Sequence, residues 1–551
     1  VQEDNETEQV KAEKAEKEEI NEIHLRDKDS LYENDDDTSV VTMYLTVSKG
    51  NSSENTYHTW KEINSYSVYD YEDMGVERYQ VAGLLQVGDE NGPTQGEVGY
   101  GESVPNATVQ IRGQTSSQNA QKNYKIELKK NKGTWRGQRT INLNKHMTEG
   151  MRFRNPQMVG LRTQFVHLYV KDNTEESGVK FEDYGIYTQV EQLNKTALKS
   201  HGLDSNGQLY KINSFEFYRY EDIIKKEDDA GYDKTAFEKM LEIKGDSDHT
   251  KLIDMLTDLN DYSIGIEDVL KEHFDEENIV YWMAFQILMG NVDTQNRNVY
   301  LYSPLNSDIW YFIAWDNDGC LMRPEYELRN FSDQNSWEKG ISNYWGNILF
   351  QRCLKSRSFR EKLNDAILDL REYLNKDMLT SKIESYKNVL KPYLYLMPDA
   401  EYEPLTSEQY DQIAASLPDE IEKNYQLYLE SLETPMPFYI GVPTIDGDKL
   451  KFNWDVSYDL DAEDITYSVE VARDYLFQDV IYQNTTLTVP EAEMDLPNAG
   501  QYFVRVRATN TSGKTQDAFD YYVTDEGKHY GMKCFYITED NTVEEDIYEE
   551  G

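Results

Sequence analysis

The sequence predicts an α+β fold in which a strand-rich lobe precedes a helical lobe, with a small all-β domain at the end. Up to about residue 215, short segments with period-two alternation of apolar residues dominate. From 216 to 432 the apolar residues recur at i, i+3 and i+4, the spacing of helices. Alternating strands return after the proline-containing linker "ETPMP" (433–437). We therefore expect a two-lobed domain over 39–432, divided into 39–215 and 216–432, followed by a β-domain over 433–527.

Order is predicted to begin at residue 40, after an acidic stem. Residues 1–38 combine a helix-forming run, "VKAEKAEKEEINEI", with the acid run "ENDDDTS", and neither has an apolar face. We interpret this segment as a solvated, flexible tether. A Ca²⁺ role for Asp35, Asp36 and Asp37 would need partner ligands that the sequence does not identify.

The first lobe is predicted from its strand patterns. The strand candidates are "VVTMYLTV" (40–47), "ERYQVAGLLQVG", "NATVQIRG", "KNYKIELKK", "TQFVHLYVKD" (163–172), "YGIYTQVEQ" (184–192) and "GQLYKIN" (207–213). Helical spacing follows in "DKTAFEKMLEIKG", "HTKLIDMLTDLNDY", "IGIEDVLKEHF", "SFREKLNDAILDLREYL" and "EQYDQIAASLPDEIEKNYQLYLESL". The segment "EENIVYWMAFQILMG" is apolar nearly all round, which indicates a buried central helix ending at Gly290.

The C-terminal segments "KLKFNWDV", "ITYSVEVARD", "TTLTVP" and "GQYFVRVRATN" alternate with period two and are separated by turn residues. This pattern predicts a small β-sandwich, and its Trp454 strand and the run "LPNAGQYFVRVRATNTSGKTQDAF" resemble a fibronectin type III module. We expect residues 528–551 to be an acidic tail without a site.

The composition excludes several classes of partner. Acidic residues outnumber basic ones by 102 to 56, and the formal net charge of −46 repels nucleic acids and anionic membrane surfaces. We therefore expect no nucleic-acid partner and favour basic polypeptides or cations. No run of 18 apolar residues exists, so no transmembrane segment is predicted. The cysteines Cys320, Cys353 and Cys534 are too scattered for a disulfide framework or a cysteine-ligated zinc site.

The chain begins at Val1 rather than at methionine. We interpret this as the loss of an upstream signal peptide, with a lipid anchor as one candidate for that region. The expected location is the bacterial cell surface or the extracellular space.

The segment 289–319, "MGNVDTQNRNVYLYSPLNSDIWYFIAWDNDG", carries the candidate chemistry. Asp293 lies in a loop after the buried helix, and Asn298 follows five residues later. Strands at 299–303 and 308–315 would form a hairpin whose return strand ends at Asp316 and Asp318. The hairpin would thus bring three carboxylates and a carboxamide to one end.

Such a set suits metal-assisted phosphoryl transfer. One aspartate can orient and deprotonate an acceptor hydroxyl, while an asparagine and a further aspartate hold Mg²⁺ against nucleotide phosphates. The spacing Asp-x₄-Asn, with an aspartate 18 residues later, parallels the order of the protein-kinase catalytic loop, hairpin and metal-binding aspartate. The His-Arg pair and the Asp-Phe-Gly triplet of typical kinases are absent.

From the spacing alone, an ordinary polar hairpin with solvated aspartates remains open. A Ca²⁺ loop at "DNDG" would lack the distal glutamate. A glycosidase that uses Asp293 and Asp316 would give no reason for Lys122 or Asn298.

The strand lobe should supply a cation for the phosphates. The segment "VQIRGQTSSQNAQKNYKIEL" (109–128) reads as a strand, a small polar loop and a second strand that carries Lys122 and Lys125. The loop can offer backbone N–H and hydroxyl groups to phosphates, although it matches no established phosphate-binding loop. Arg112 and Ser116 of this segment are counted among the predicted nucleotide-binding residues.

These segments together resemble the spore-coat-protein-H (CotH) kinase family over roughly residues 40–395. The resemblance is carried by "MYLTVSKGNSSE", "VQIRGQTSSQNAQKNYKIELKK", "MRFRN", "FEDYGIYTQVEQLNK", "GQLYKIN", "GNVDTQNRNVYLY" and "WYFIAWDND", in that order. The family implies a compact kinase-like fold and an ATP- and Mg²⁺-dependent (or Mn²⁺-dependent) protein kinase. Its acceptors would be Ser or Thr hydroxyls of a secreted or cell-surface protein, such as a basic or Ser-rich one.

The resemblance implies a role for each site residue. Lys122 would hold the phosphates and Glu191 would be its ion-pair partner. Asp293 would be the catalytic-loop acid. Asn298 and Asp316 would bind the metal, and Asp318 would support that metal or bind a second one.

Two departures from the family leave a second hypothesis open. The approach to the lysine reads Ala120-Gln121-Lys122 instead of a Pro-Lys-Lys pattern. After Asn155 the chain reaches the next strand without the longer helical stretch that the family usually has. A catalytically degenerate kinase fold that serves as a surface scaffold or adhesion module, with the type III domain as a spacer, is therefore the alternative to an active kinase.

Overall fold

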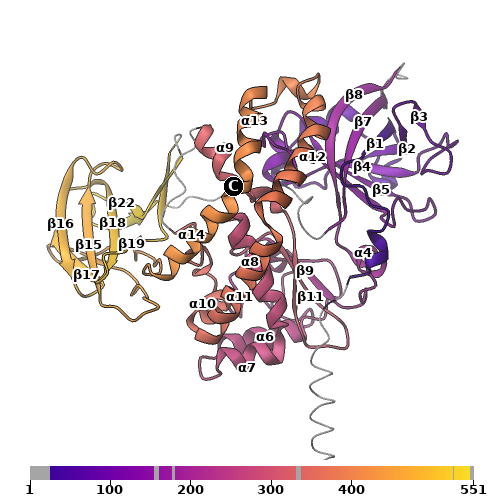
Figure 1. Ribbon diagram of the computed structural model, residues 1–551. Coiled ribbons are helices and arrows are strands. Elements are labelled where there is room, and N and C mark those ends of the chain that lie inside the picture. The colour runs from indigo at the N-terminus through magenta and orange to yellow at the C-terminus, as the bar shows by residue number, and fades with distance from the viewer. Residues whose placement is uncertain are drawn as a thin grey trace, which may run out of the picture.

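The structure is a computed structural model of the 551-residue chain, and it describes residues 25, 27–153, 161–175, 180–329, 337–524 and 527–546. The predicted α+β class is confirmed: a strand-rich lobe, a helical lobe and an all-β domain follow one another along the chain (Figure 1). None of the helices within these ranges is long and apolar enough to cross a bilayer.

The first lobe is a closed β-barrel. Its strands are β1 (Val40–Ser48), β2 (Val81–Asp89), β3 (Gly92–Pro93), β4 (Ala107–Arg112), β5 (Asn123–Leu128), β6 (Thr140–Asn144), β7 (Thr163–Asn173) and β8 (Glu182–Glu191). They follow the order β1-β7-β8-β6-β5-β4-β2-β3, and an additional pairing of β1 with β2 closes the barrel, with the short β3 paired to β2. Inward-facing apolar side chains such as Leu45, Val109 and Ile126 alternate along the strands and fill the interior. Short helices α2 (Trp60–Ser65) and α3 (Val68–Met74) accompany this barrel.

The second lobe is built around one central helix and a small sheet. The sheet has the order β10-β9-β11-β12, formed by β9 (Gln208–Ile212), β10 (Leu241–Ile243), β11 (Val299–Ser303) and β12 (Tyr311–Ala314). The predicted division of the domain at residue 215 is therefore wrong for β9, because this strand pairs with β10 and β11 of the second lobe. The helices are α4 (Lys195–Ser200), α5 (Lys234–Met240), α6 (Thr250–Asn260), α7 (Ile266–His273), α8 (Glu276–Met289), α9 (Arg323–Leu328), α10 (Ile348–Lys355), α11 (Arg357–Tyr373), α12 (Lys376–Leu394), α13 (Ser407–Ser416) and α14 (Glu420–Leu432). Figure 1 shows α12 reaching from this lobe to the barrel beside β8.

Helix α8 confirms the prediction of a buried helix that ends at Gly290. Asp275 caps its first turn by accepting a hydrogen bond from the Asn278 N–H at 3.0 Å. Apolar residues on all sides are buried in the core of the lobe. Gly290 closes the helix with φ +61°, and a side chain there would lie 2.7 Å from Asn424, so the position needs glycine for two reasons.

The last domain is a two-sheet sandwich that extends beyond its predicted end. One sheet is β13-β14-β17, and the other is β16-β15-β18-β22-β23 with β19 paired to β18. The bounds are β13 (Thr444–Asp446), β14 (Lys449–Asn453), β15 (Ile465–Ala472), β16 (Val480–Leu487), β17 (Glu491–Asp495), β18 (Gly500–Asn510), β19 (Thr515–Asp517), β20 (Tyr521–Thr524), β21 (Gly527–Tyr530), β22 (Met532–Ile537) and β23 (Val543–Glu545). Because β22 pairs with the central strand β18, residues 528–546 are part of the sandwich, and the prediction of a tail from residue 528 is wrong.

The predicted stem boundary is also corrected. Residues 1–24 of the stem lie outside the described residues, but the chain from Asp27 onward is tied to both lobes. Asp35 forms ion pairs with Arg136 and Arg162 of the first lobe. Asp37 accepts a hydrogen bond from Tyr386 of α12 at 2.6 Å. Asp35 and Asp37, two of the three aspartates singled out in the acid run, therefore bind side chains of the two lobes, which supply the cations and donors that the local sequence lacks.

Candidate active site

The loop that follows α8 holds Asp293 and Asn298 together, as predicted. The Asn298 side-chain NH₂ donates to the Asp293 carboxylate at 2.8 Å and to the Asp293 carbonyl at 2.9 Å. Asn298 has φ +58°, which turns the chain sharply before β11 begins. Arg297 lies 3.8 Å from the same carboxylate. The Asp293 side chain is 57 % exposed, so an acceptor hydroxyl can reach it.

The turn after β12 carries Asp316 and Asp318 to the same end of the hairpin. A buried amide network fixes this turn to the Asp293 loop. The Asn317 Oδ1 atom accepts from the Gln286 side chain of α8 at 3.2 Å, and the Asn291 NH₂ donates to Gln286 at 2.9 Å. Leu321 N–H donates to the Met289 carbonyl at 2.7 Å, which closes the turn onto the end of α8.

The acids of this region act on one another electrostatically. Burial raises the pKa of Asp318 well above its ordinary value, and the charges of Asp316, Glu149 and Asp293 raise it further. Desolvation by the surrounding protein raises the pKa of Asp293, and the charge of Asp316 raises it further, against the lowering effects of Arg297, Lys528 and the Asn298 hydrogen bond. Four carboxylates thus share one neighbourhood, and their mutual repulsion favours the arrival of a cation. We call Glu149, Asp293, Asp316 and Asp318 the acid cluster.

The acid cluster fits a magnesium ion that a nucleotide brings, rather than an all-protein metal cage. Within the described ranges, no three His, Cys, Asp or Glu side chains lie close enough to form a complete metal-binding group. Mg²⁺ prefers oxygen ligands and commonly takes only one or two carboxylates, with phosphates and water supplying the rest. Asp316, Asp318 and the side-chain oxygen of Asn298 offer that kind of donor set.

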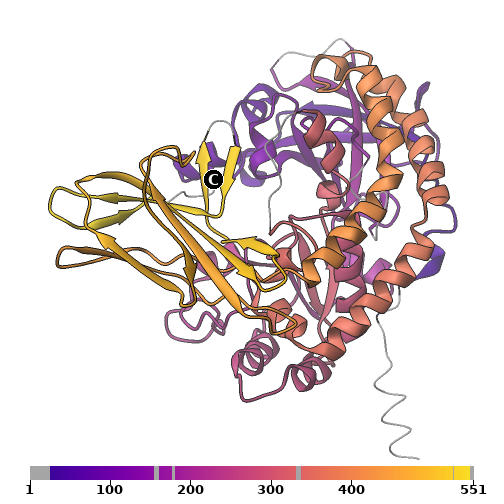
Figure 2. The same cartoon turned by 60° about the vertical axis from the view of Figure 1, so that its left-hand side comes forward.

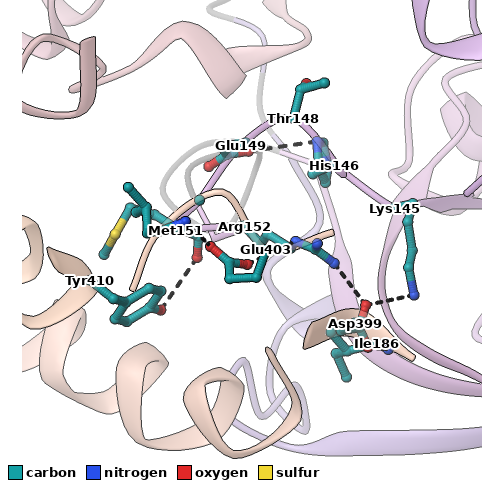
Figure 3. Close-up of polar contacts among 12 residues, drawn as sticks. Lys145, His146, Thr148, Glu149, Met151, Arg152, Ile186, Asp399, Glu403 and Tyr410 are labelled. Atoms are coloured by element: carbon teal, nitrogen blue, oxygen red, sulfur yellow. Dashed lines mark hydrogen bonds and ion pairs between the residues drawn. The ribbon is translucent and has the colours of Figure 1, made fainter. Parts of the chain in front are cut away.

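Glu149 lies in a segment of the first lobe, and a buried network of charged side chains fixes this segment in place (Figure 3). Asp399 is 1 % exposed, and it accepts hydrogen bonds at 2.8 Å from Arg152 and from the Ile186 N–H. Lys145 lies 2.8 Å from the same carboxylate. Gly150, next to Glu149, donates its N–H to Glu325 of α9 at 2.9 Å. The segment 145–152 is therefore fixed between the barrel and the helices.

Besides Arg297, which lies beside Asp293, a cation from each lobe interacts with Asp316. Arg112 stands at the end of β4 and hydrogen bonds with Asn144, and its charge interacts with Asp316. Lys211 of β9 interacts with Asp316 and with Glu242, the residue opposite it on β10. Burial lowers the pKa of both cations. Arg112, one of the predicted nucleotide-binding residues, thus lies within electrostatic range of Asp316, and its binding of phosphate stays a prediction.

Lys122 is directed elsewhere. It precedes Asn123, the residue that lies opposite Arg112 in the β4–β5 pairing, so alternation places its side chain on the other face. Its ammonium group donates to the Ser117 carbonyl at 2.6 Å, and its main charged neighbour is Asp70. Ser116 accepts a hydrogen bond at 3.0 Å from the Asn123 side chain, which ties the polar loop to β5.

The predicted ion pair between Lys122 and Glu191 is wrong. Glu191 lies at the other end of the barrel strands, opposite Ile141, and its carboxylate hydrogen bonds with His201 at 2.8 Å. The second ring nitrogen of His201 hydrogen bonds with Asp27. The resemblance assigned this role to Glu191 only because the residue lies in a family-like segment of the sequence. Strand register decides which side chains meet.

Sequence reasoning missed several residues of the site. Glu149, Lys211, Asn291 and Asn317 were not singled out, although each lies in or next to a segment that carries the family resemblance. Their signal was weak because a lysine or asparagine within a strand or turn looks the same whether it faces solvent or a site. The stretch after Asn155, where a shortened helix was expected, falls mainly on residues outside the described ones.

Comparison with known proteins identifies the family of the chain. A family model described as CotH kinase protein matches residues 109–428, which is more than half of the chain. A solved structure, the crystal structure of a Helicobacter pylori proinflammatory kinase CtkA, is similar at 11% sequence identity and a TM-score of 0.24, covering 56% of this chain and 94% of that chain. No curated protein matches. The chain is a kinase-like protein and belongs to the CotH kinase family.

Proposed function

We propose that the protein is an ATP- and Mg²⁺-dependent protein kinase that phosphorylates Ser or Thr hydroxyls of a secreted or cell-surface protein. The observation that carries the proposal is the meeting of the acid cluster with Arg112 and Lys211. Phosphoryl transfer needs this combination of a proton acceptor, metal-binding oxygens and cations for phosphate.

Each residue has a distinct role in this proposal. Asp293, reachable from solvent and oriented by Asn298, accepts the proton of the acceptor hydroxyl as its oxygen bonds to the γ-phosphorus and the bond to the leaving ADP oxygen breaks. Asp316, Asp318 and Asn298 hold Mg²⁺, which when bound neutralises phosphate charge. Arg112 and Lys211 bind phosphate oxygens, a role that the sequence had assigned to Lys122.

The charge of the protein supports a basic acceptor. With a net charge of −46, the surface attracts cationic polypeptides at long range and repels acidic ones. Export to the cell surface or the extracellular space is part of the same proposal.

The test is labelled-phosphate transfer from ATP to the protein itself or to a basic, Ser-containing peptide, with and without Mg²⁺ or Mn²⁺. We expect metal-dependent labelling that falls by about 10³-fold or more in Asp293→Asn, because the proton acceptor is lost while the shape is kept. Lys449→Ala, at an exposed ion pair of the last domain, is the matched control and should leave labelling unchanged.

The alternative is a kinase fold that lacks activity and serves as a surface scaffold. The absence of a Lys122–Glu191 pair in the described structure favours it, because typical kinases need such a pair. Thermal stabilisation by ATP only in the presence of metal would support the kinase. No stabilisation by any nucleotide, together with no labelling, would establish the scaffold.

A further inference from the structure

The C-terminal sandwich lies against the lobe that carries the candidate active site. Figures 1 and 2 show its last strands on the side that faces the helical lobe. The contact is made with residues 337–348, which we call the bridging segment because its other side contacts the Asp293 loop.

Aromatic side chains form the contact between the sandwich and the bridging segment. The Trp337 ring lies 5.2 Å from Phe519 and 5.7 Å from Tyr530, measured between ring centroids. The Trp345 ring lies 5.4 Å from Tyr458. Both tryptophans are 5 % exposed. Packing of buried aromatic rings stabilises a fixed docking position instead of a loose tether.

Polar contacts extend this interface into the interior. Gln516, which is 1 % exposed, donates its side-chain N–H to Ser342 of the bridging segment at 3.4 Å. Asn510 donates to the Glu433 carbonyl at the end of α14 at 3.0 Å. Both bonds join the sandwich to the helical lobe, and the Gln516 bond is buried, where an unmade hydrogen bond is costly.

The other side of the bridging segment forms three hydrogen bonds to the Asp293 loop. The Asn343 side chain donates to the Val292 carbonyl at 3.0 Å. The Tyr344 hydroxyl lies 3.2 Å from the Thr294 hydroxyl.

The Asn347 side chain donates to the Gln295 carbonyl at 2.9 Å. The residues on both sides of Asp293 are thus bonded to one segment, and the sandwich packs on the back of that segment.

We infer that the C-terminal sandwich is part of the catalytic unit: it clamps the bridging segment so that Asn343, Tyr344 and Asn347 hold the Asp293 loop in position. These three are positioning residues for the proposed reaction, and the inference rests on the proposed function for its effect on rate. It replaces the expectation that the domain is a spacer. The hairpin β20–β21 adds a second contact, because Tyr530 hydrogen bonds with Glu338 and Lys528 interacts with Asp293.

The test removes the clamp in the full-length chain without touching the acid cluster. Phe519→Ala takes away the ring that packs on Trp337, and Gln516→Ala removes one buried hydrogen bond without a large cavity. Phe519→Leu keeps the apolar contact and should restore most of the wild-type behaviour. Tyr482→Ala on the edge strand β16 is the matched aromatic control within the same domain.

Two readouts separate this inference from the proposed function. Hydrogen exchange of the amides at 291–298 should rise about tenfold or more in Phe519→Ala, less in Gln516→Ala, and not at all in Tyr482→Ala. The kcat for phosphate transfer should fall about tenfold or more in Phe519→Ala, with the KM for ATP changed by less than about threefold, because a small misplacement of a reacting group costs rate rather than nucleotide binding.

Unchanged exchange and unchanged kcat in both interface variants would overturn the inference. Raised exchange in a protein whose wild type transfers no phosphate would support the clamp while the proposed function fails. If Phe519→Ala does not fold, the milder Gln516→Ala decides by the same two measurements.

Discussion

The acid cluster and the Asp399 network are two concentrations of charge in the same molecule, and they differ in how that charge is balanced. Asp399 is buried with Lys145, Arg152 and a backbone N–H as direct partners. Asp318, in the acid cluster, has three other carboxylates as its main charged neighbours. The buried ion pairs of Asp399 join the two lobes and stabilise their contact. The like charges around Asp318 raise the pKa of its carboxyl group beyond the effect of burial, and the site is suited to a ligand that carries positive charge.

The largest expected effect concerns the Asp399 network, in which the buried charges are balanced. Asp399→Ala leaves the buried Lys145 and Arg152 without their shared anion, and we expect the free energy of unfolding to fall by about 3 to 5 kcal/mol. Denaturant unfolding measures the change. Asp369→Ala on the exposed face of α11 is the control, and an effect no larger than this control would contradict a structural role for the network.

A smaller effect sharpens the assignment of phosphate contacts. Arg112→Ala should weaken ATP binding by about 10- to 100-fold, because the variant loses the charge-assisted hydrogen bond that the Arg112 guanidinium would donate to an ATP phosphate. Lys122→Ala, on the other face of the same strand pair, should change ATP affinity less than about threefold although it can reduce stability. Binding of ATP with Mg²⁺ measured by calorimetry distinguishes the two. An equal or larger loss in Lys122→Ala would return the phosphate role to that lysine.

A third prediction uses pH on another balanced site, the His201 pair with Asp27 and Glu191. Burial lowers the pKa of His201, but the hydrogen bonds and charges of Asp27 and Glu191 raise it more, to about 9. Because this pKa exceeds the ordinary 6.5, the stability gained from charged His201 is complete below about pH 6.5 and is lost as pH rises through about 9.

We expect this loss to be on the order of 2 kcal/mol between pH 7 and 10. His201→Gln should flatten that part of the stability curve measured by denaturant unfolding. A curve that His201→Gln does not alter would show that the pair is not charged in the folded protein.

The smallest expected effect concerns the repulsion among the carboxylates of the acid cluster. Asp318→Asn removes one like charge, so without metal it should stabilise the protein by about 1 kcal/mol while lowering phosphate transfer. Adding Mg²⁺ with ATP should stabilise the wild type and have less effect on the variant. Thermal unfolding with and without metal measures both, and a destabilised metal-free variant would contradict the repulsion.

Local sequence determined the order of secondary structure and the chemistry of one hairpin. The apolar pattern of 276–289 predicts a buried helix, and the spacing of Asp293, Asn298 and Asp316 follows from a loop, two short strands and a turn. These features depend on residues close in the chain, where helix and strand periodicity is direct evidence. The family resemblance added the proposed activity, and the nucleotide-binding role of Arg112 stays a prediction.

Only the tertiary structure decided which distant groups meet. The face on which Lys122 lies depends on the pairing of β4 with β5, and the partner of Glu191 depends on the closing of the barrel. The link from Phe519 through Trp337 to the Asp293 loop joins residues more than 200 positions apart. Such contacts arise from packing and register, which a one-residue change in strand pairing would reverse, so no local pattern records them.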